Sequence, residues 1–217
     1  RLLKKSSLKY AFVTYDLTKI EYNNSSINAC VSQDFRKEGQ VLIPLEKLFR
    51  QYTGESLAVK LAEFADVRER IRYLVEQVEN ITGIKSFGEY ITEMIEIDAF
   101  FLNEDRHTNN IAVLYDEENE QYFVSPFFDQ GLCLFADTRQ DYPLEMTLEL
   151  PIEQCVDKIE AKPFSSEFDT QLEAAEELFG TQLEFHFTIQ DIHRELEALA
   201  DFYPEDIRQR VELLMRQ

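Results

Sequence analysis

Two polar motifs on either side of a hairpin-like stretch constrain the fold of this chain most strongly. The first motif reads NEDRHTNN, from Asn103 to Asn110, and the second reads FFDQG, from Phe127 to Gly131. Between them lie two short apolar runs, IAVLY and QYFV, which are joined by the acidic segment DEENE. This pattern predicts a β-hairpin. Because a hairpin returns the chain to the end where it began, we expect Asp105, Asn110 and Asp129 to converge.

These three residues supply the polar groups that phosphoryl transfer requires. A carboxylate at Asp105 can accept or orient the proton of an attacking hydroxyl. The amide of Asn110 and the carboxylate of Asp129 can hold Mg²⁺ ions that bridge phosphates. Taken singly, such residues are more often polar caps or surface ion pairs. The complete set, with a hairpin between its halves, favours a functional site.

The spacing of the motifs resembles the catalytic core of protein kinases, in which H-R-D-x-x-x-x-N is followed by D-F-G. The Asp-Arg-His order is similar to that of the phosphoinositide kinases, and the long hairpin before the second Asp is similar to the HipA-like serine/threonine kinases of bacteria. The resemblance implies that Asp105 is the catalytic base and that Asn110 and Asp129 bind metal. It also implies that Arg106 and His107 support this loop or assist catalysis.

The resemblance implies a protein kinase-like α+β fold with a mainly α-helical large lobe and a partial β small lobe. Residues 1–35 would be the remnant of the small lobe with its hinge, and residues 36–217 would be the large lobe. The six glycines form no G-x-G-x-x-G or Walker-type phosphate loop. No upstream Lys takes the place of the phosphate-pairing kinase Lys. We therefore expect that the chain lacks about the first half of a small lobe, or that it is a degenerate kinase that never had it.

Two runs of β-branched and aromatic residues predict antiparallel strands near the start of the chain, from Lys9 to Asp16 and from Ser26 to Phe35. A polar turn around Asn23 separates them. By resemblance, Val31 to Asp34, with Gln33 between them, would be the hinge whose backbone pairs with adenine. A plain edge strand is the alternative.

Helical periodicity dominates the rest of the chain. Helices are expected from Pro44 to Tyr52, after Glu55, from Asp66 to Thr82, from Ser86 to Leu102, from Ser165 or Ser166 to Gly180, from Thr188 and from Pro204. Ser86 and Glu89 predict a capping box. Asp98 interrupts the apolar stripe of the same helix. Because a carboxylate on an apolar face is costly unless it is bonded, we expect Asp98 to buttress the following loop.

Composition excludes several classes of function. The chain has 22 basic and 42 acidic residues, a net charge of −20, and such a surface repels a nucleic acid backbone. No run approaches the roughly 18 apolar residues of a membrane span, and the first residues lack the apolar segment of a secretory signal. We expect a soluble cytoplasmic protein that binds neither nucleic acid nor membrane. Cys30, Cys133 and Cys155 are odd in number and widely spaced, which predicts small buried apolar residues without disulfides or zinc.

The expected function is transfer of the ATP γ-phosphate, with Mg²⁺, to a Ser or Thr of a protein substrate. A lipid or small-molecule kinase of the same fold is one alternative, because the catalytic loop does not report the acceptor. A non-catalytic pseudokinase or toxin-system module, with an antitoxin-like partner, is the other. The missing phosphate loop favours that module, whereas the intact Asp, Asn and Asp favour an enzyme. By resemblance, Thr138, Tyr142 and Thr147 lie in an activation-loop region and are candidates for phosphorylation.

Overall fold

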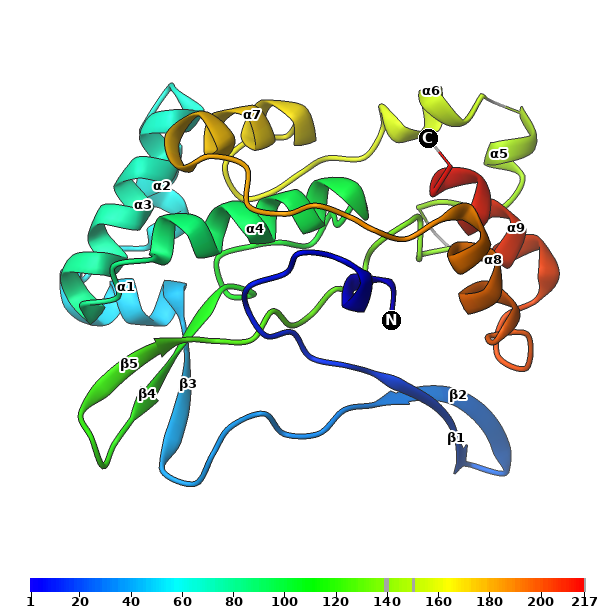
Figure 1. The fold of residues 1–217 in the computed structure, drawn as a ribbon, viewed down its shortest axis with the longest axis horizontal. Helices are drawn as coiled ribbons and strands as arrows, with labels where there is room; N and C mark the ends of the chain where they lie inside the picture. Colours follow the sequence, from blue (N-terminus) through cyan, green and yellow to red (C-terminus); the bar gives the residue numbers. More distant parts are fainter. Residues whose placement is uncertain (139–140, 150, 217) are drawn as a thin grey trace.

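The fold is built around helix α4 (Phe87–Phe100), which runs through the middle of the molecule (Figure 1). The computed structural model describes residues 1–138, 141–149 and 151–216, without the side chains of residues 148 and 149. Helices α3 (Val67–Thr82) and α7 (Phe168–Phe179) pack against α4 and against each other. Helices α1 (Leu45–Thr53) and α2 (Leu57–Ala62) continue this layer beyond α3. The largest hydrophobic core lies among these helices.

A second group of helices lies at the opposite end of α4 (Figure 1). Its members are α5 (Met146–Glu149), α6 (Ile152–Val156), α8 (Ile189–Glu197) and α9 (Glu205–Leu214), with the short 3-10 helix η1 (Leu2–Lys5) against α8. A smaller core that includes Phe135, Tyr142 and Leu214 joins the segment after the second motif to α6 and α9. The end of the chain therefore packs near the candidate site.

A three-stranded antiparallel sheet confirms the predicted hairpin between the two motifs. Strands β4 (Ala112–Asp116) and β5 (Gln121–Val124) are its hairpin, and β3 (Gln40–Pro44) pairs with the other edge of β4. The pairing of β3 with β4 was not predicted, because no local pattern specifies a partner so distant in the sequence. It places the start of α1 beside the first motif, where the Leu45 amide donates to the Ile111 carbonyl at 2.8 Å.

The second sheet is a two-stranded hairpin of β1 (Asp16–Tyr22) and β2 (Ser25–Val31). The turn was predicted correctly: Asn23 and Asn24 have φ values of 49° and 59°, as a two-residue hairpin turn requires. The predicted strand from Lys9 to Asp16 was wrong, since the strand begins only at Asp16. The residues before it instead bridge to Phe127, whose carbonyl accepts from the Val13 amide at 2.8 Å.

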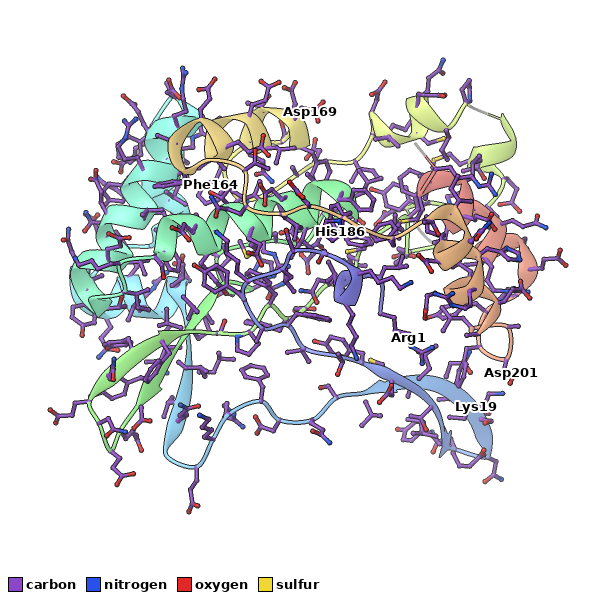
Figure 2. All side chains as sticks on the ribbon, viewed as in Figure 1. Arg1, Lys19, Phe164, Asp169, His186 and Asp201 are labelled. Carbon is purple, nitrogen blue, oxygen red and sulfur yellow. The ribbon has the colours of Figure 1, made fainter. Side chains whose placement is uncertain are left out.

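This hairpin contacts the helical body at the connection between α8 and α9. The Asn28 side-chain amide donates to the Phe202 carbonyl at 2.7 Å, and the Lys19 ammonium lies 5.8 Å from the centre of the Phe202 ring. Figure 2 shows Lys19 and Asp201 close together at this contact. Both faces of the hairpin are otherwise largely exposed, and Cys30 is exposed with them. The predicted burial of this cysteine was therefore wrong.

Most helix boundaries follow local signals. Asp66 caps α3 by accepting from the Arg68 amide, and Thr188 and Asp191 form a capping box at the start of α8. The capping box predicted at Ser86 was wrong, because that side chain makes no cap hydrogen bond. The helix also ends at Phe100, two residues earlier than expected. No helix among the described residues is long and apolar enough to cross a membrane.

Helix α4 is buried on nearly all sides rather than along one stripe. Two extended segments of the chain cover its polar side, which includes the buried Glu93 and Glu96. The Glu93 carboxylate accepts the backbone amides of Lys9 and Tyr10, and Glu96 accepts the amide of Gln182 at 2.7 Å. Among the residues that the structure describes, the two segments have no neighbouring strand at these positions, so the carboxylates accept their backbone amides instead. These hydrogen bonds allow Glu93 and Glu96 to be buried.

The burial of Glu96 makes stability depend on pH. Burial, reinforced by the Glu176 carboxyl on α7, raises the pKa of Glu96 to about 7, and its Oε2 has no hydrogen-bond partner among the described residues. The folded protein therefore holds a proton that the unfolded chain releases at lower pH, so stability falls as the pH rises toward 7. The loss of stability caused by ionising this buried carboxyl is fully present above pH 7. A rise of the pKa from the ordinary Glu value to about 7 corresponds to roughly 3 kcal/mol in the free energy of unfolding.

Glu96→Gln is thus expected to be more stable than the parent at pH 8 and nearly equal to it at pH 4, because Gln cannot ionise. Urea unfolding at both pH values would measure this difference. Glu76→Gln changes an exposed glutamate of α3 and is the matched control. An equal free energy of unfolding for parent and Glu96→Gln at pH 8 would contradict the expectation.

Candidate active site

The first motif forms an irregular loop between α4 and β4. Asp105 and Asn110 lie in successive turns of this loop and not on a regular helix. The Asn110 amide donates to the His107 carbonyl at 2.8 Å, and the His107 amide donates to the Asp105 carbonyl at 2.9 Å. Leu102, with φ of 52°, turns the chain out of the helix and into the loop.

Asp98 holds this loop from the end of α4, as predicted. Its carboxylate accepts from Arg106 Nε at 2.7 Å and from Arg106 Nη2 at 3.0 Å, and the Asn103 side-chain amide donates to it at 2.8 Å. The side chains of Asp98 and Arg106 are each 1% exposed. A buried charge of this kind is tolerated only when it is paired and hydrogen-bonded. Asp98 and Arg106 therefore anchor the loop together.

Arg106 also joins the two motifs. Its Nη1 donates to the Asn110 carbonyl at 2.8 Å and to the Phe128 carbonyl at 2.9 Å. Phe128 immediately precedes Asp129, so one buried guanidinium fixes the backbone beside both candidate metal ligands. The two motifs therefore meet in space. Arg106 contacts backbone and Asp98, which makes it a positioning residue.

The side-chain oxygens of Asn110 and Asp129 are suited to bind Mg²⁺. The Asn110 Nδ2 donates to the Asp105 carbonyl at 2.9 Å, which leaves its Oδ1 as the free acceptor. In the described part of the chain, the Asp129 carboxylate accepts no hydrogen bond, while its backbone amide donates to the Tyr15 hydroxyl at 3.3 Å. Mg²⁺ prefers oxygen ligands and commonly takes one or two protein side chains together with phosphate oxygens. The donor set fits this ion.

Unusual backbone conformations gather around the two motifs. Seven non-glycine residues with positive φ are found in the described ranges, and three of them lie in the hairpin turns. The other four flank the candidate site: Leu102, Asp129, Leu134 and Phe135. Non-glycine residues with positive φ store backbone strain, and they are concentrated at functional sites. Asp129, one of the two candidate metal ligands, has a φ of 57°.

His107 lies beside the candidate catalytic carboxylate. Its Nε2 is 3.9 Å from Asp105 Oδ1, and 46% of its side chain is exposed. The Nδ1 atom is buried and has no hydrogen-bond partner among the described residues. The imidazole therefore borders Asp105 without locking it in place.

The predicted hinge residues span the end of β2, whose last residue is Val31, and the segment that follows it. Val31, Gln33 and Asp34 are all exposed. Hydrogen bonds from the side chain and amide of Arg36 lower the pKa of Asp34 to about 2. The next residue, Phe35, stacks on Phe128 with ring centroids 6.2 Å apart. This contact brings the predicted hinge close to the Asp129 turn.

A cleft of about 500 Å³ opens beside Asp105, and the sequence did not point to most of its lining. Its walls come from Glu104 and Asp105 in the loop, from the segment around Tyr142, and from residues 158–162. Lys158 and Lys162 place two cations within an otherwise acidic rim. With Leu132, the lining residues come from four separate segments of the chain, so no sequence spacing marks them as neighbours. The cleft leaves Asp105 accessible from outside the protein.

Known proteins were compared with the chain by sequence and by structure. No protein-family model matches the sequence, and no curated protein matches it either. The fold is similar to the crystal structure of CtkA, a proinflammatory kinase of Helicobacter pylori, with a TM-score of 0.63 and 17% sequence identity. The match covers 94% of this chain and 76% of that chain. At this level of identity the likeness establishes the fold alone. The protein therefore has a kinase-like α+β fold.

Proposed function

We propose that the protein is a HipA-like kinase that transfers the γ-phosphate of ATP, with Mg²⁺, to a Ser or Thr hydroxyl of a protein substrate. One observation carries this proposal: the buried Arg106 donates to the carbonyls of both Asn110 and Phe128 and so joins the first motif to the residue that precedes Asp129. Two oxygen donors and a nearby carboxylate are the groups that phosphoryl transfer uses. The kinase-like fold is consistent with this chemistry.

Each residue of the site has a distinct role in the proposal. Asp105 accepts the proton of the acceptor hydroxyl, or orients it, from the edge of the cleft. Asn110 and Asp129 hold Mg²⁺, which neutralises charge on the phosphates when it is bound. Arg106 positions both motifs through its hydrogen bonds to the Asn110 and Phe128 carbonyls. His107 borders Asp105 and supports the orientation of the acceptor.

The proposed adenine site lies at the hinge. The Phe35–Phe128 contact supports this assignment, because it holds residues 31–34 near the Asp129 turn. The Asp34 carboxylate is engaged by Arg36, so in this proposal the backbone from Val31, at the end of β2, to Gln33 is the part that pairs with adenine. In the same proposal, residues 36–217 form the large lobe, and the β1–β2 hairpin is the small-lobe part of residues 1–35.

The first test is thermal unfolding of the protein with and without Mg²⁺ and ATP. A ligand that binds only the folded state, at about 100 times its Kd, stabilises it by roughly 2.7 kcal/mol. We expect Asp129→Asn to lose this stabilisation, because an amide is a poorer ligand for Mg²⁺ than a carboxylate. Asn also tolerates the positive φ of this position, so the unliganded variant should unfold at the same temperature as the parent.

Asp201→Asn, which changes an exposed residue far along the chain, is the matched control and should keep the full rise. An equal rise for parent and Asp129→Asn would mean that nucleotide binds elsewhere. No rise for either protein would favour a non-catalytic interaction module over an active kinase. The exposed Tyr22, Ile27 and Val31 of the β1–β2 hairpin are the observation that supports this second function.

A further inference from the structure

Tyr142 forms one wall of the cleft beside Asp105. Its side chain is only 8% exposed and stacks on Phe135, with ring centroids 4.8 Å apart. Its hydroxyl donates to Glu104 Oε2 at 2.5 Å. Burial, together with the Glu104 carboxylate, raises the pKa of Tyr142, so the hydroxyl keeps its proton and remains a donor.

Helix α9 holds Tyr142 from behind through Arg210. This guanidinium is 4% exposed and donates to three backbone carbonyls: Phe135 at 2.8 Å, Tyr142 at 2.7 Å and Pro143 at 3.2 Å. The Tyr142 amide donates to the Asp137 carbonyl at 2.9 Å. Backbone and ring are thus both fixed, which directs the Tyr142 hydroxyl toward the loop. A side chain fixed in this way can hold its partner at little entropic cost.

Glu104 is the partner that this hydroxyl restrains. It immediately precedes Asp105, and its backbone amide donates to the Leu132 carbonyl at 3.2 Å. Both carboxylates line the same cleft. Without the Tyr142 hydroxyl, Glu104 would have no side-chain hydrogen bond in the described part of the chain. Its carboxylate would then be free to move into the space that an acceptor must occupy.

We propose that Tyr142 is a positioning residue, which holds Glu104 and thereby the backbone of Asp105 in the geometry that catalysis needs. The structural part of this inference stands on the Tyr142–Glu104 contact, and its catalytic consequence rests on the proposed kinase function. Reacting groups must be placed within fractions of an ångström, so a loosened Asp105 lowers the rate of transfer more than the binding of nucleotide.

Tyr142→Phe tests the inference, because Phe keeps the stacking on Phe135 and removes only the hydroxyl. Amide hydrogen exchange across residues 103–107 should become faster, while exchange in α8 and α9 stays the same. In a transfer assay, kcat should fall by at least about tenfold, the lower value for one hydrogen bond to a charged group, with the KM for ATP unchanged. Tyr52→Phe is the matched control, since it removes a hydroxyl contact with Tyr122 far from the cleft.

A second pair of variants asks whether Tyr142 acts through Glu104. In a Glu104→Ala background, Tyr142→Phe should have no further effect on exchange across residues 103–107 or on kcat. An undiminished effect in that background, or unchanged exchange in Tyr142→Phe alone, would overturn the inference. The exchange measurement needs no nucleotide. It therefore separates failure of this inference from failure of the kinase function, which the Asp129→Asn test reports.

Discussion

Replacement of Asp98 by Ala is expected to lower the free energy of unfolding by about 3 to 5 kcal/mol, the cost of leaving a buried charge without its partner. The Asp98 carboxylate binds two nitrogens of Arg106 and the Asn103 amide, and the side chains of Asp98 and Arg106 are each 1% exposed. Urea unfolding would measure the loss. The exposed Asp201→Ala is the control and should change stability by less than about 0.5 kcal/mol.

A double variant separates the contribution of Asp98 and Arg106 to the stability of the protein from their effect on the candidate site. Asp98→Leu with Arg106→Met removes both buried charges, and such replacements often restore stability. It also removes the donor shared by the Asn110 and Phe128 carbonyls. We therefore expect the double variant to be more stable than Asp98→Ala and still to lose the stabilisation by Mg²⁺ and ATP. A loss below about 1 kcal/mol in Asp98→Ala would show that the loop does not depend on the pair.

Asp105→Asn is expected to lower kcat by about 10²- to 10⁴-fold, because an amide cannot accept the proton of the acceptor hydroxyl. Stabilisation by Mg²⁺ and ATP should remain, since the candidate metal ligands are Asn110 and Asp129. The unliganded stability should also remain, because the Asp105 carboxylate accepts no hydrogen bond from the described residues and His107 Nε2 lies 3.9 Å from it. Steady-state transfer assays and thermal unfolding would measure the two effects.

Asp141→Asn is the matched control for Asp105→Asn. It removes an exposed carboxylate from the rim of the same cleft, and its effect on kcat should be small. Full activity in Asp105→Asn would contradict the assignment of the base. A parallel loss of nucleotide binding in that variant would instead place Asp105 among the groups that hold the phosphates.

Local signals in the sequence were sufficient for several elements near the site. The hairpin between the motifs, the cap of α3 by Asp66 and the start of α8 after Thr188 were all predicted from neighbouring residues. The buttressing role of Asp98 was also predicted, because an isolated carboxylate on an apolar face must find a partner. In each case the energetic reason lies within a few turns of chain.

Other features depend on segments that meet only in the folded protein. The burial of Glu93 and Glu96 on α4 could not be predicted, because the covering segments come from both ends of the chain. The failed strand at Lys9 has the same cause: its backbone bonds are taken by Glu93 on α4. The pairing of β3 with β4 is equally non-local.

By itself, the sequence determined that Asp105, Asn110 and Asp129 would lie at one end of a hairpin and that Asp98 would need a partner. Those conclusions follow from periodicity and from the cost of an unpaired buried carboxylate. Only the tertiary structure decided that Arg106 would be that partner and would join the two motifs. It alone also placed Tyr142 against Glu104 beside the cleft. The physical reason is that a buried guanidinium or hydroxyl bonds to whichever acceptors packing brings within about 3 Å, and distance along the chain does not specify them.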